Sequence, residues 1–493
     1  MKQRFNRRQF LLLGASTIGT IYLTRRAFGQ TTSSGSQNRA TKETGLLKAD
    51  LEARYGQVNL AGSQAYLLGY NGQVPGPLLE ARPGDTVRIR LTNQLSEPTN
   101  IHYHGLHVPP SGNADNIFLE IASGETHTSE FTLPKNHPAG IFWYHPHVHG
   151  LVAKQLFGGL AGLFIVRGEL DQIPELQAAR EAFLVLKDFA IGTDGQMLPP
   201  NQMEEMMQGR EGALVTANGA VNPAISIPQF GLLRLRLLNA SSSRFYRLAL
   251  EEHPLYLIAT DGGSLAEPVE LRELLLAPGE RAEVLVRGER EPGQYRLLNL
   301  PYHRGGMMGG GGMGMMGGGM MGGGMMGGGM MGGANPSTHG SETLATLTYT
   351  EKVTPLPLPS KLIPIEALPT PQTVRRFTLN TGMAFRINGK TFDPNRVDTQ
   401  VRLNTVEDWE IANTSMMMSM DHPFHLHTNP FQVISRNGTP EPYLAWKDTV
   451  LVRQGEVVRI RVAFKDFPGR TIYHCHISDH GDRGMMGVLG IEG

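Results

Sequence analysis

The chain contains one cysteine in 493 residues, and the residues around it limit both the fold and the chemistry. Cys475 belongs to the run His474-Cys475-His476-Ile-Ser-Asp-His480-Gly-Asp-Arg-Gly-Met485. A thiolate, imidazoles and a weak axial thioether are the ligands of an electron-transfer copper site, whose second imidazole would come from elsewhere in the chain. The alternative for a lone cysteine is a small buried apolar side chain, but three histidines within five residues favour a metal ligand.

Side chains on a β-strand point alternately to opposite faces. In a strand through residues 474–476, His474 and His476 share one face and Cys475 points to the other. Two metal sites are therefore predicted, and the backbone of one residue in each direction would join them. The segment indicates an electron bridge between the two sites.

Three further histidine clusters accompany this segment: His102-Tyr-His104-Gly105, His145-Pro-His147 and His422-Pro-Phe-His425-Leu-His427. A spacing of two places both imidazoles of a pair on one strand face, whereas His422 has the opposite parity to His425 and His427. Parity thus assigns His422 to the site of Cys475, which His480 and Met485 can complete from the following loop.

The second predicted site receives eight imidazoles, which suit three copper ions: His102, His104, His145, His147, His425, His427, His474 and His476. Any one pair could equally be a solvated strand face, but four pairs beside the only cysteine favour a metal cluster. Zinc is the rival metal, but its structural sites are tetrahedral with four ligands and do not need eight histidines.

The length of the chain suits about three domains of roughly 150 residues each. Formal net charge is zero, with 45 basic and 45 acidic residues, so nothing in the composition favours nucleic acid or an anionic membrane as a partner. From about residue 45, short apolar alternations bounded by Pro-Gly and Asn-Gly turns predict an all-β chain. We expect three β-sandwich domains over residues 45–168, 175–352 and 372–493, with a proline-rich linker at 353–371.

The N-terminus, residues 1–29, has the features of a twin-arginine export signal. The pattern Asn6-Arg7-Arg8-Gln-Phe-Leu-Leu12 precedes an apolar stretch to Leu23 that is short for a membrane span. Ala27 and Gly29 have the spacing of a signal-peptidase site, so the mature chain would begin near Gln30. We expect a periplasmic or otherwise exported protein with no membrane span in its mature chain.

One segment, residues 305–333, is almost wholly glycine and methionine and holds eleven of the 23 methionines. It lies between two strand-like stretches, 294–300 and 343–349. We expect it to be a long excursion from a hairpin late in the second domain.

The motifs HxHG, HxH, HxxHxH and HCHxxxHxxxxM, in this order, resemble the copper motifs of three-domain bacterial multicopper oxidases of the laccase or copper-efflux cuprous oxidase type. The resemblance covers nearly all of the chain after the signal, and the stretches 71–77, 140–147 and 387–393 support it. It implies three cupredoxin-like Greek-key β-sandwich domains. All ten histidines are present, which argues against the metal-free relatives of this family.

The resemblance implies four copper ions and assigns their ligands. The type 1 site would use His422, Cys475, His480 and Met485; type 2 copper would be held by His102 and His425; the type 3 pair by His104, His145, His147, His427, His474 and His476. It further implies oxidation of a donor at type 1 copper, electron transfer through Cys475 and reduction of dioxygen to water at the other three ions. An axial methionine implies a rather low type 1 potential and easily oxidised donors.

Family members use acidic residues to deliver protons to oxygen. Asp115 resembles the one near type 2 copper, with a surface carboxylate as the alternative. A glutamate often follows the second type 1 histidine, but Gly481 stands there, which leaves Asp479 or Asp482 as substitutes. His107 and His149 match no ligand position and are expected to be structural or to support ligands.

The electron donor is the least constrained part of the prediction. Thioethers prefer Cu(I), so the methionine-rich segment could collect cuprous ions, or it could be a low-complexity lid. Copper-efflux oxidases bind a substrate copper just before the first type 1 histidine, and Met420 resembles their methionine there, whereas Met418 stands where an aspartate is expected. The alternative for both methionines is ordinary packing around the copper site. Three functions follow: a cuprous oxidase with laccase-like activity on phenols in copper tolerance, a general laccase, and a copper storage or delivery protein without turnover.

Overall fold

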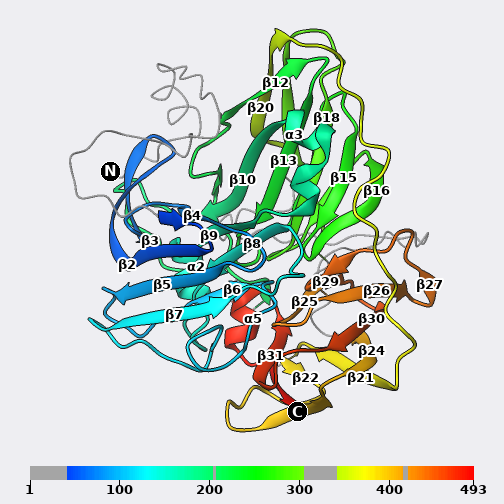
Figure 1. Ribbon diagram of the computed structural model, residues 1–493. Helices are drawn as coiled ribbons and strands as arrows, with labels where there is room; N and C mark the ends of the chain where they lie inside the picture. Colours follow the sequence, from blue (N-terminus) through cyan, green and yellow to red (C-terminus); the bar gives the residue numbers. More distant parts are fainter. Residues whose placement is uncertain (1–40, 202, 204–206, 305–340, 383, 415–419) are drawn as a thin grey trace, which may run out of the picture.

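A computed structural model describes residues 41–201, 203, 207–304, 341–382, 384–414 and 420–493. The predicted export signal, the methionine-rich segment and Met418 lie outside these residues. Three successive units follow one another along the described chain, each built from two β-sheets (Figure 1). Within the described part of the chain, no helix is long and apolar enough to span a membrane.

The first unit packs a five-stranded sheet on a four-stranded one. The five-stranded sheet has the order β1-β2-β5-β7, with β3 also paired to β2: β1 (Thr41–Glu43), β2 (Leu46–Leu60), β3 (Ser63–Tyr70), β5 (Thr86–Asn93) and β7 (Thr126–Thr132). The second sheet has the order β4-β9-β8-β6: β4 (Gly76–Ala81), β9 (Gly162–Val166), β8 (Gly140–His145) and β6 (His102–His104). Buried and solvent-facing residues alternate along β5, as expected of a strand with one face on a core. Helix α2 (Val152–Gly158) follows β8.

The second unit begins with two short helices, η1 (Glu169–Gln172) and α3 (Pro174–Ala178). Its six-stranded sheet has the order β11-β10-β13-β18-β15-β16: β11 (Leu214–Ala217), β10 (Arg180–Phe189), β13 (Leu232–Asn239), β18 (Arg281–Arg287), β15 (Leu255–Thr260) and β16 (Gly263–Leu271). Its five-stranded sheet has the order β12-β20-β19-β14-β17: β12 (Ala224–Gln229), β20 (Glu342–Lys352), β19 (Gln294–Leu300), β14 (Tyr246–Leu250) and β17 (Leu274–Leu276). The antiparallel pairing of β19 with β20 confirms the hairpin predicted around the methionine-rich segment.

The third unit carries the cysteine. Its seven-stranded sheet has the order β22-β21-β24-β30-β26-β27, with β28 also paired to β26: β22 (Arg386–Ile387), β21 (Thr373–Asn380), β24 (Thr405–Asn413), β30 (Val457–Phe464), β26 (Phe431–Arg436), β27 (Thr439–Pro440) and β28 (Trp446–Lys447). Its five-stranded sheet has the order β23-β32-β31-β25-β29: β23 (Val397–Arg402), β32 (Met486–Glu492), β31 (Gly469–Cys475), β25 (His422–Leu426) and β29 (Thr449–Val452). Helix α5 (Ser478–Asp482) leaves the end of β31.

All three units repeat one pairing pattern. Each sheet contains one parallel pair, and the other strand pairs are antiparallel: β2 with β5, β10 with β13 and β21 with β24 in the first sheets, and β4 with β9, β12 with β20 and β23 with β32 in the second. Each unit buries an apolar cluster drawn from both of its sheets. The predicted all-β fold of three sandwich domains is confirmed.

The proline-rich segment between the second and third units contains no helix or strand. It is nevertheless tied to both units. The Leu362 amide donates to Ala266 O (2.8 Å), and the Leu368 amide donates to Gln432 Oε1 (2.9 Å). Leu362 is buried against the core of the second unit. The segment is therefore a linker that is hydrogen-bonded to both units.

Candidate metal centre

Two pairs of neighbouring strands bring the predicted histidines together. In the first unit, β6 pairs with β8 so that His102 lies opposite His145. In the third unit, β25 pairs with β31 so that His425 lies opposite His474. Antiparallel partners lie about 5 Å apart, so each ladder gathers imidazoles from two separate motifs.

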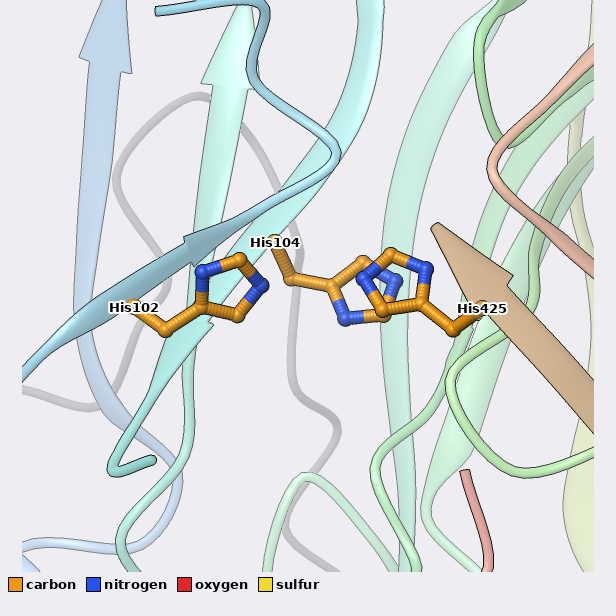
Figure 2. A group of neighbouring side chains, drawn as sticks. All are labelled: His102, His104 and His425. Carbon is orange, nitrogen blue, oxygen red and sulfur yellow. The ribbon is translucent and has the colours of Figure 1, made fainter. Parts of the chain in front are cut away.

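The two ladders face each other across the boundary between the first and third units. His102 stacks on His427 and His104 stacks on His425, each with ring centroids 3.8 Å apart. Figure 2 shows His102 and His104 reaching from the first unit towards His425 of the third. The histidine cluster is therefore shared between the ends of the chain and exists only when these units are docked.

Ring nitrogens converge in three groups, within which ligand atoms lie at most 4.8 Å apart: His102, His104 and His425; His104, His145 and His476; and His147, His427 and His474. In the last group, Nε2 of His147 and Nε2 of His427 lie 3.2 and 3.1 Å from Nε2 of His474. Three imidazole nitrogens that face one another cannot all be satisfied by hydrogen bonds among themselves. A shared metal ion would satisfy them.

Several of these rings are held through one nitrogen and leave the other free. Nδ1 donates to a carboxylate in His102 and to a backbone carbonyl in His145 and His425. Nε2 of these three side chains is buried and has no hydrogen-bond partner among the described residues. A histidine that binds a metal usually donates its other N–H in this way, which fixes the tautomer. The arrangement fits copper, for which imidazole is a suitable ligand.

Electrostatics keep the cluster in a state that can bind metal. Burial, followed by the proximity of other imidazoles, lowers the pKa of His102, His147 and His427 well below the usual range. Neutral imidazole has a lone pair to offer, whereas imidazolium has none. The unprotonated cluster therefore suits a cation.

A second group lies around Cys475. Its Sγ is 3.5 Å from Nδ1 of His422 and 3.7 Å from Nδ1 of His480, and all three side chains are buried. Met485 is also buried, and it belongs to the same apolar core cluster as Cys475. Burial raises the pKa of the Cys475 thiol to about 12, so a bound cation would be needed to keep it as a thiolate near neutral pH. One soft sulfur between two imidazole nitrogens matches the donor set of a type 1 copper.

Asp115 lies where the sequence predicted an acidic partner of the cluster. Both of its carboxylate oxygens are 2.9 Å from His102 Nδ1, and Oδ1 also accepts the Tyr103 amide. Burial raises the pKa of Asp115 to about 7. The side chain is 2% exposed, so it is not the surface carboxylate that was considered as the alternative.

The two substitutes considered for the missing glutamate are in different surroundings. Asp479 forms a bidentate ion pair with Arg210. Asp482 accepts the amides of Gly150 and Ala153 and lines a small cavity together with Gly481 and four cluster imidazoles. Burial raises the pKa of Asp482 to about 6. The geometry favours Asp482 as the carboxyl group closer to the cluster.

The remaining predicted residues have mixed surroundings. Met420, two residues before His422, is buried, and its carbonyl accepts the Asn413 side chain. His107 lies between Thr428 O (2.7 Å) and Asp466 Oδ2 (2.9 Å), so it links the first and third units. His149 contacts the ring of Phe392.

Sequence reasoning missed two side chains that hold the cluster. Asn100 Oδ1 accepts the His147 amide at 2.5 Å. Asp448 contacts His104 and His425 and is 2% exposed. The available signal for Asp448 is a carboxylate directly before the strand-like run 449–452, but no pattern in the sequence links either residue to a histidine.

The chain is similar to known proteins over most of its length. Models of the multicopper oxidase family match residues 52–171, 181–308 and 366–492. The multicopper oxidase Mco of Staphylococcus haemolyticus is 31% identical over 430 residues, which cover 86% of this chain and 83% of that protein. The cell division protein FtsP of Photorhabdus laumondii is 30% identical over 438 residues, which cover 85% and 84%.

Solved structures have the same fold. A multicopper oxidase from Campylobacter jejuni, described as a metallo-oxidase, superposes with a TM-score of 0.79 at 30% identity and covers 92% of this chain and 93% of its own. The matched family models span most of the chain and all three units. The chain therefore belongs to the multicopper oxidase family.

Proposed function

We propose that this protein is an exported oxidase that couples one-electron oxidation of a donor to the four-electron reduction of dioxygen to water. One observation carries the proposal: ten buried imidazoles and the single thiol form two ligand groups of different chemistry within one fold. When bound, a type 1 copper and a cluster of three coppers would supply the electron transfer and the oxygen chemistry. Because relatives include a protein named for cell division, the ligand set rather than homology supports this reaction.

The backbone around Cys475 provides the connection that such an enzyme needs. Cys475 belongs to the thiolate group, and the adjacent His474 and His476 belong to the imidazole cluster. His474 Nδ1 also lies 2.9 Å from Cys475 O, which adds a hydrogen-bonded route to the covalent one. Asp115, with its elevated pKa, would hold His102 and exchange protons near the cluster.

For the donor, we propose cuprous ions, with phenols as further substrates, in a role in copper tolerance. The methionine-rich segment 305–333 follows directly after Arg304. The Asp421 amide donates to Arg304 O (3.0 Å), and Tyr302 donates to Asp421 Oδ2 (2.5 Å). Asp421 precedes His422, so the chain enters this segment beside the proposed type 1 site. Soft thioethers there would suit Cu(I).

The donor is tested by steady-state kinetics with Cu(I) and with a phenol. Deletion of residues 305–333 should lower Cu(I) turnover and copper-stimulated phenol oxidation. A matched variant in which the eleven methionines become leucine keeps the length and removes the sulfur, so it should lose Cu(I) turnover to a similar extent. If both variants oxidise Cu(I) like the wild type, the cuprous role is wrong; a faster phenol reaction without added copper would then favour a general laccase with a lid.

A storage or delivery protein is distinguished by oxygen uptake. Copper-loaded wild type should consume oxygen when a donor is present, and Cys475→Ser should abolish this uptake together with the blue absorption. A storage protein should consume none in either form.

Export is a separate part of the proposal and rests on residues 1–29. Replacing Arg7 and Arg8 by lysine should retain the protein in the cytoplasm, which cell fractionation would detect. Unchanged export of this variant would contradict the twin-arginine route.

A further inference from the structure

Asp448 touches imidazoles from two different units, one through its carboxylate and one through its backbone carbonyl. Its Oδ1 lies 3.0 Å from His104 Nε2, and its backbone carbonyl lies 2.8 Å from His425 Nδ1. A neutral imidazole donates through one nitrogen and accepts through the other. Donation to Asp448 therefore leaves the lone pairs on His104 Nδ1 and His425 Nε2, and both atoms lack a hydrogen-bond partner among the described residues. Asp448 thus selects which nitrogen each ring presents to the cluster.

Arg281, from the second unit, fixes this carboxylate. Its Nη1 donates to Asp448 Oδ1 (2.7 Å) and its Nη2 to Oδ2 (2.6 Å), a two-pronged contact that sets the plane of the carboxylate. Arg281 is itself held by the carbonyls of Ile141 and Asp261 at 3.0 and 2.9 Å. Both members of the ion pair are at most 2% exposed. The contact therefore joins all three units at one point.

Two glycines leave room for the second unit at the cluster. A Cβ on Gly105 would overlap Arg281 Nη2 and lie 2.5 Å from Asp448 Oδ2. A Cβ on Gly279 would lie 2.8 Å from Nε2 of His476. Both glycines have positive φ, +86° and +85°, a backbone conformation that residues other than glycine rarely adopt. Backbone from the first and second units therefore packs directly on the ion pair and on a cluster imidazole.

We propose that Arg281 is a positioning residue of the metal cluster. The second unit contributes no imidazole to the ligand groups of the described chain, yet through Arg281 it orients the Asp448 carboxylate and so sets the tautomer of His104. A ring nitrogen of His104 lies in one group with those of the proposed type 2 ligands His102 and His425. This inference rests on the proposed copper cluster. An ion pair with a purely structural role would stabilise the contact between units without affecting which nitrogen binds metal.

The test compares variants of the full-length, copper-loaded protein. Arg281→Met removes the charge and both hydrogen bonds, whereas Arg281→Lys restores the charge but not the two-pronged contact. Arg236→Met is the matched control, because Arg236 is an equally buried arginine of the same unit whose ion pairs with Glu283 and Asp171 touch no histidine. Copper content, the type 2 electron paramagnetic resonance signal and the blue type 1 absorption are measured for each.

We expect Arg281→Met to weaken copper retention at the cluster by about 10- to 100-fold, the usual effect of removing a residue that supports a ligand. The type 2 signal should be lost or altered while the blue absorption stays, and Arg281→Lys should recover only part of the signal. Arg236→Met should keep both signals.

Asp448→Asn covers the case in which Arg281→Met does not fold. Its amide oxygen can still accept from Arg281, so its NH₂ group would face His104 and reverse the tautomer. It should therefore lose the type 2 signal even with Arg281 in place. Wild-type signals in both Arg281→Met and Asp448→Asn, or equal loss in Arg236→Met, would overturn the inference. A wild type without type 2 copper would instead overturn the proposed function.

Discussion

Gly105→Ala should be far more destabilising than an alanine at a comparable glycine elsewhere in the same unit. The comparison is with Gly124, which has φ of +82° against +86° for Gly105 and no heavy atom within 4 Å of the position that a Cβ would occupy. At Gly105 the new methyl group would overlap Arg281 and Asp448. The two substitutions therefore share the backbone cost and differ in the collision with the ion pair.

The magnitudes follow from these two costs. A left-handed backbone costs alanine about 1 to 2 kcal/mol, of which a less flexible unfolded chain offsets about 0.5 to 1 kcal/mol. Gly124→Ala should therefore cost about 1 kcal/mol. The collision either shifts the neighbours, an overpacking cost of about 1 to 3 kcal/mol, or breaks the buried ion pair, which costs about 3 to 5 kcal/mol. Gly105→Ala should thus cost about 1 to 5 kcal/mol more than Gly124→Ala.

Denaturant unfolding of the metal-free proteins measures this difference in the free energy of unfolding. The copper-loaded proteins provide a second readout, because displacement of Asp448 should also change the type 2 resonance signal in Gly105→Ala and leave it unchanged in Gly124→Ala. Equal stabilities and equal signals for the two alanine variants would refute the tight meeting of the three units at Gly105.

Three further outcomes are expected. Met485→Leu should raise the type 1 reduction potential because the axial ligand tunes it, at a stability cost below about 1.5 kcal/mol for a swap of similar volume; a redox titration that finds no increase would contradict the axial role. Asp115→Asn should slow oxygen reduction by about 10- to 100-fold. Anaerobic bleaching of the blue absorption by the donor should stay fast in this variant. Equal slowing of both steps would argue against a role of Asp115 that is specific to His102. Burial lowers the pKa of Lys187 from 10.5 to about 8. The buried charge therefore destabilises the folded protein by about 3 kcal/mol at neutral pH. Attraction of the ammonium group to the ring of Phe189 offsets about 1 kcal/mol of this cost. Lys187→Met should therefore raise the free energy of unfolding by about 2 kcal/mol at neutral pH. Between pH 8 and 10.5 the unfolded wild type binds more protons than the folded form, so the stability of the wild type rises with pH. The stability advantage of Lys187→Met should therefore shrink over this range. An advantage that does not change with pH would refute the role of the buried charge.

Much of the metal centre could be predicted because the period of a β-strand is two. Opposite faces for Cys475 and its neighbours follow from local geometry alone, and the same rule separates His422 from His425. The alternating apolar pattern of residues 86–91 and the Pro-Gly turns likewise depend on local geometry, so the all-β class was accessible from the sequence.

Contacts between distant parts of the chain could not be predicted from the sequence. Arg281 and Asp448 are 167 residues apart and lie in different units. Nothing in either local sequence indicates that a buried arginine will meet a buried aspartate beside His104. Only the docking of the units reveals this pairing, because the hydrogen bonds between Arg281 and Asp448 join two different units.

The choice between Asp479 and Asp482 was open for another reason. These residues lie in the short helix α5 (Ser478–Asp482), where the parity rule for strands does not apply. Their surroundings depend on two remote elements, the segment containing Arg210 and the start of α2. One carboxylate is taken up by an ion pair and the other lines the cavity by the cluster, which the sequence alone does not distinguish.

The most direct test of the central claim is the amount of oxygen consumed for each one-electron donor molecule oxidised by the copper-loaded, full-length protein. Two ligand groups joined through Cys475 should pass four electrons to each dioxygen, so one dioxygen should disappear for every four donor molecules and no hydrogen peroxide should accumulate. One dioxygen for every two donor molecules, with matching peroxide, or no uptake at all, would contradict the account.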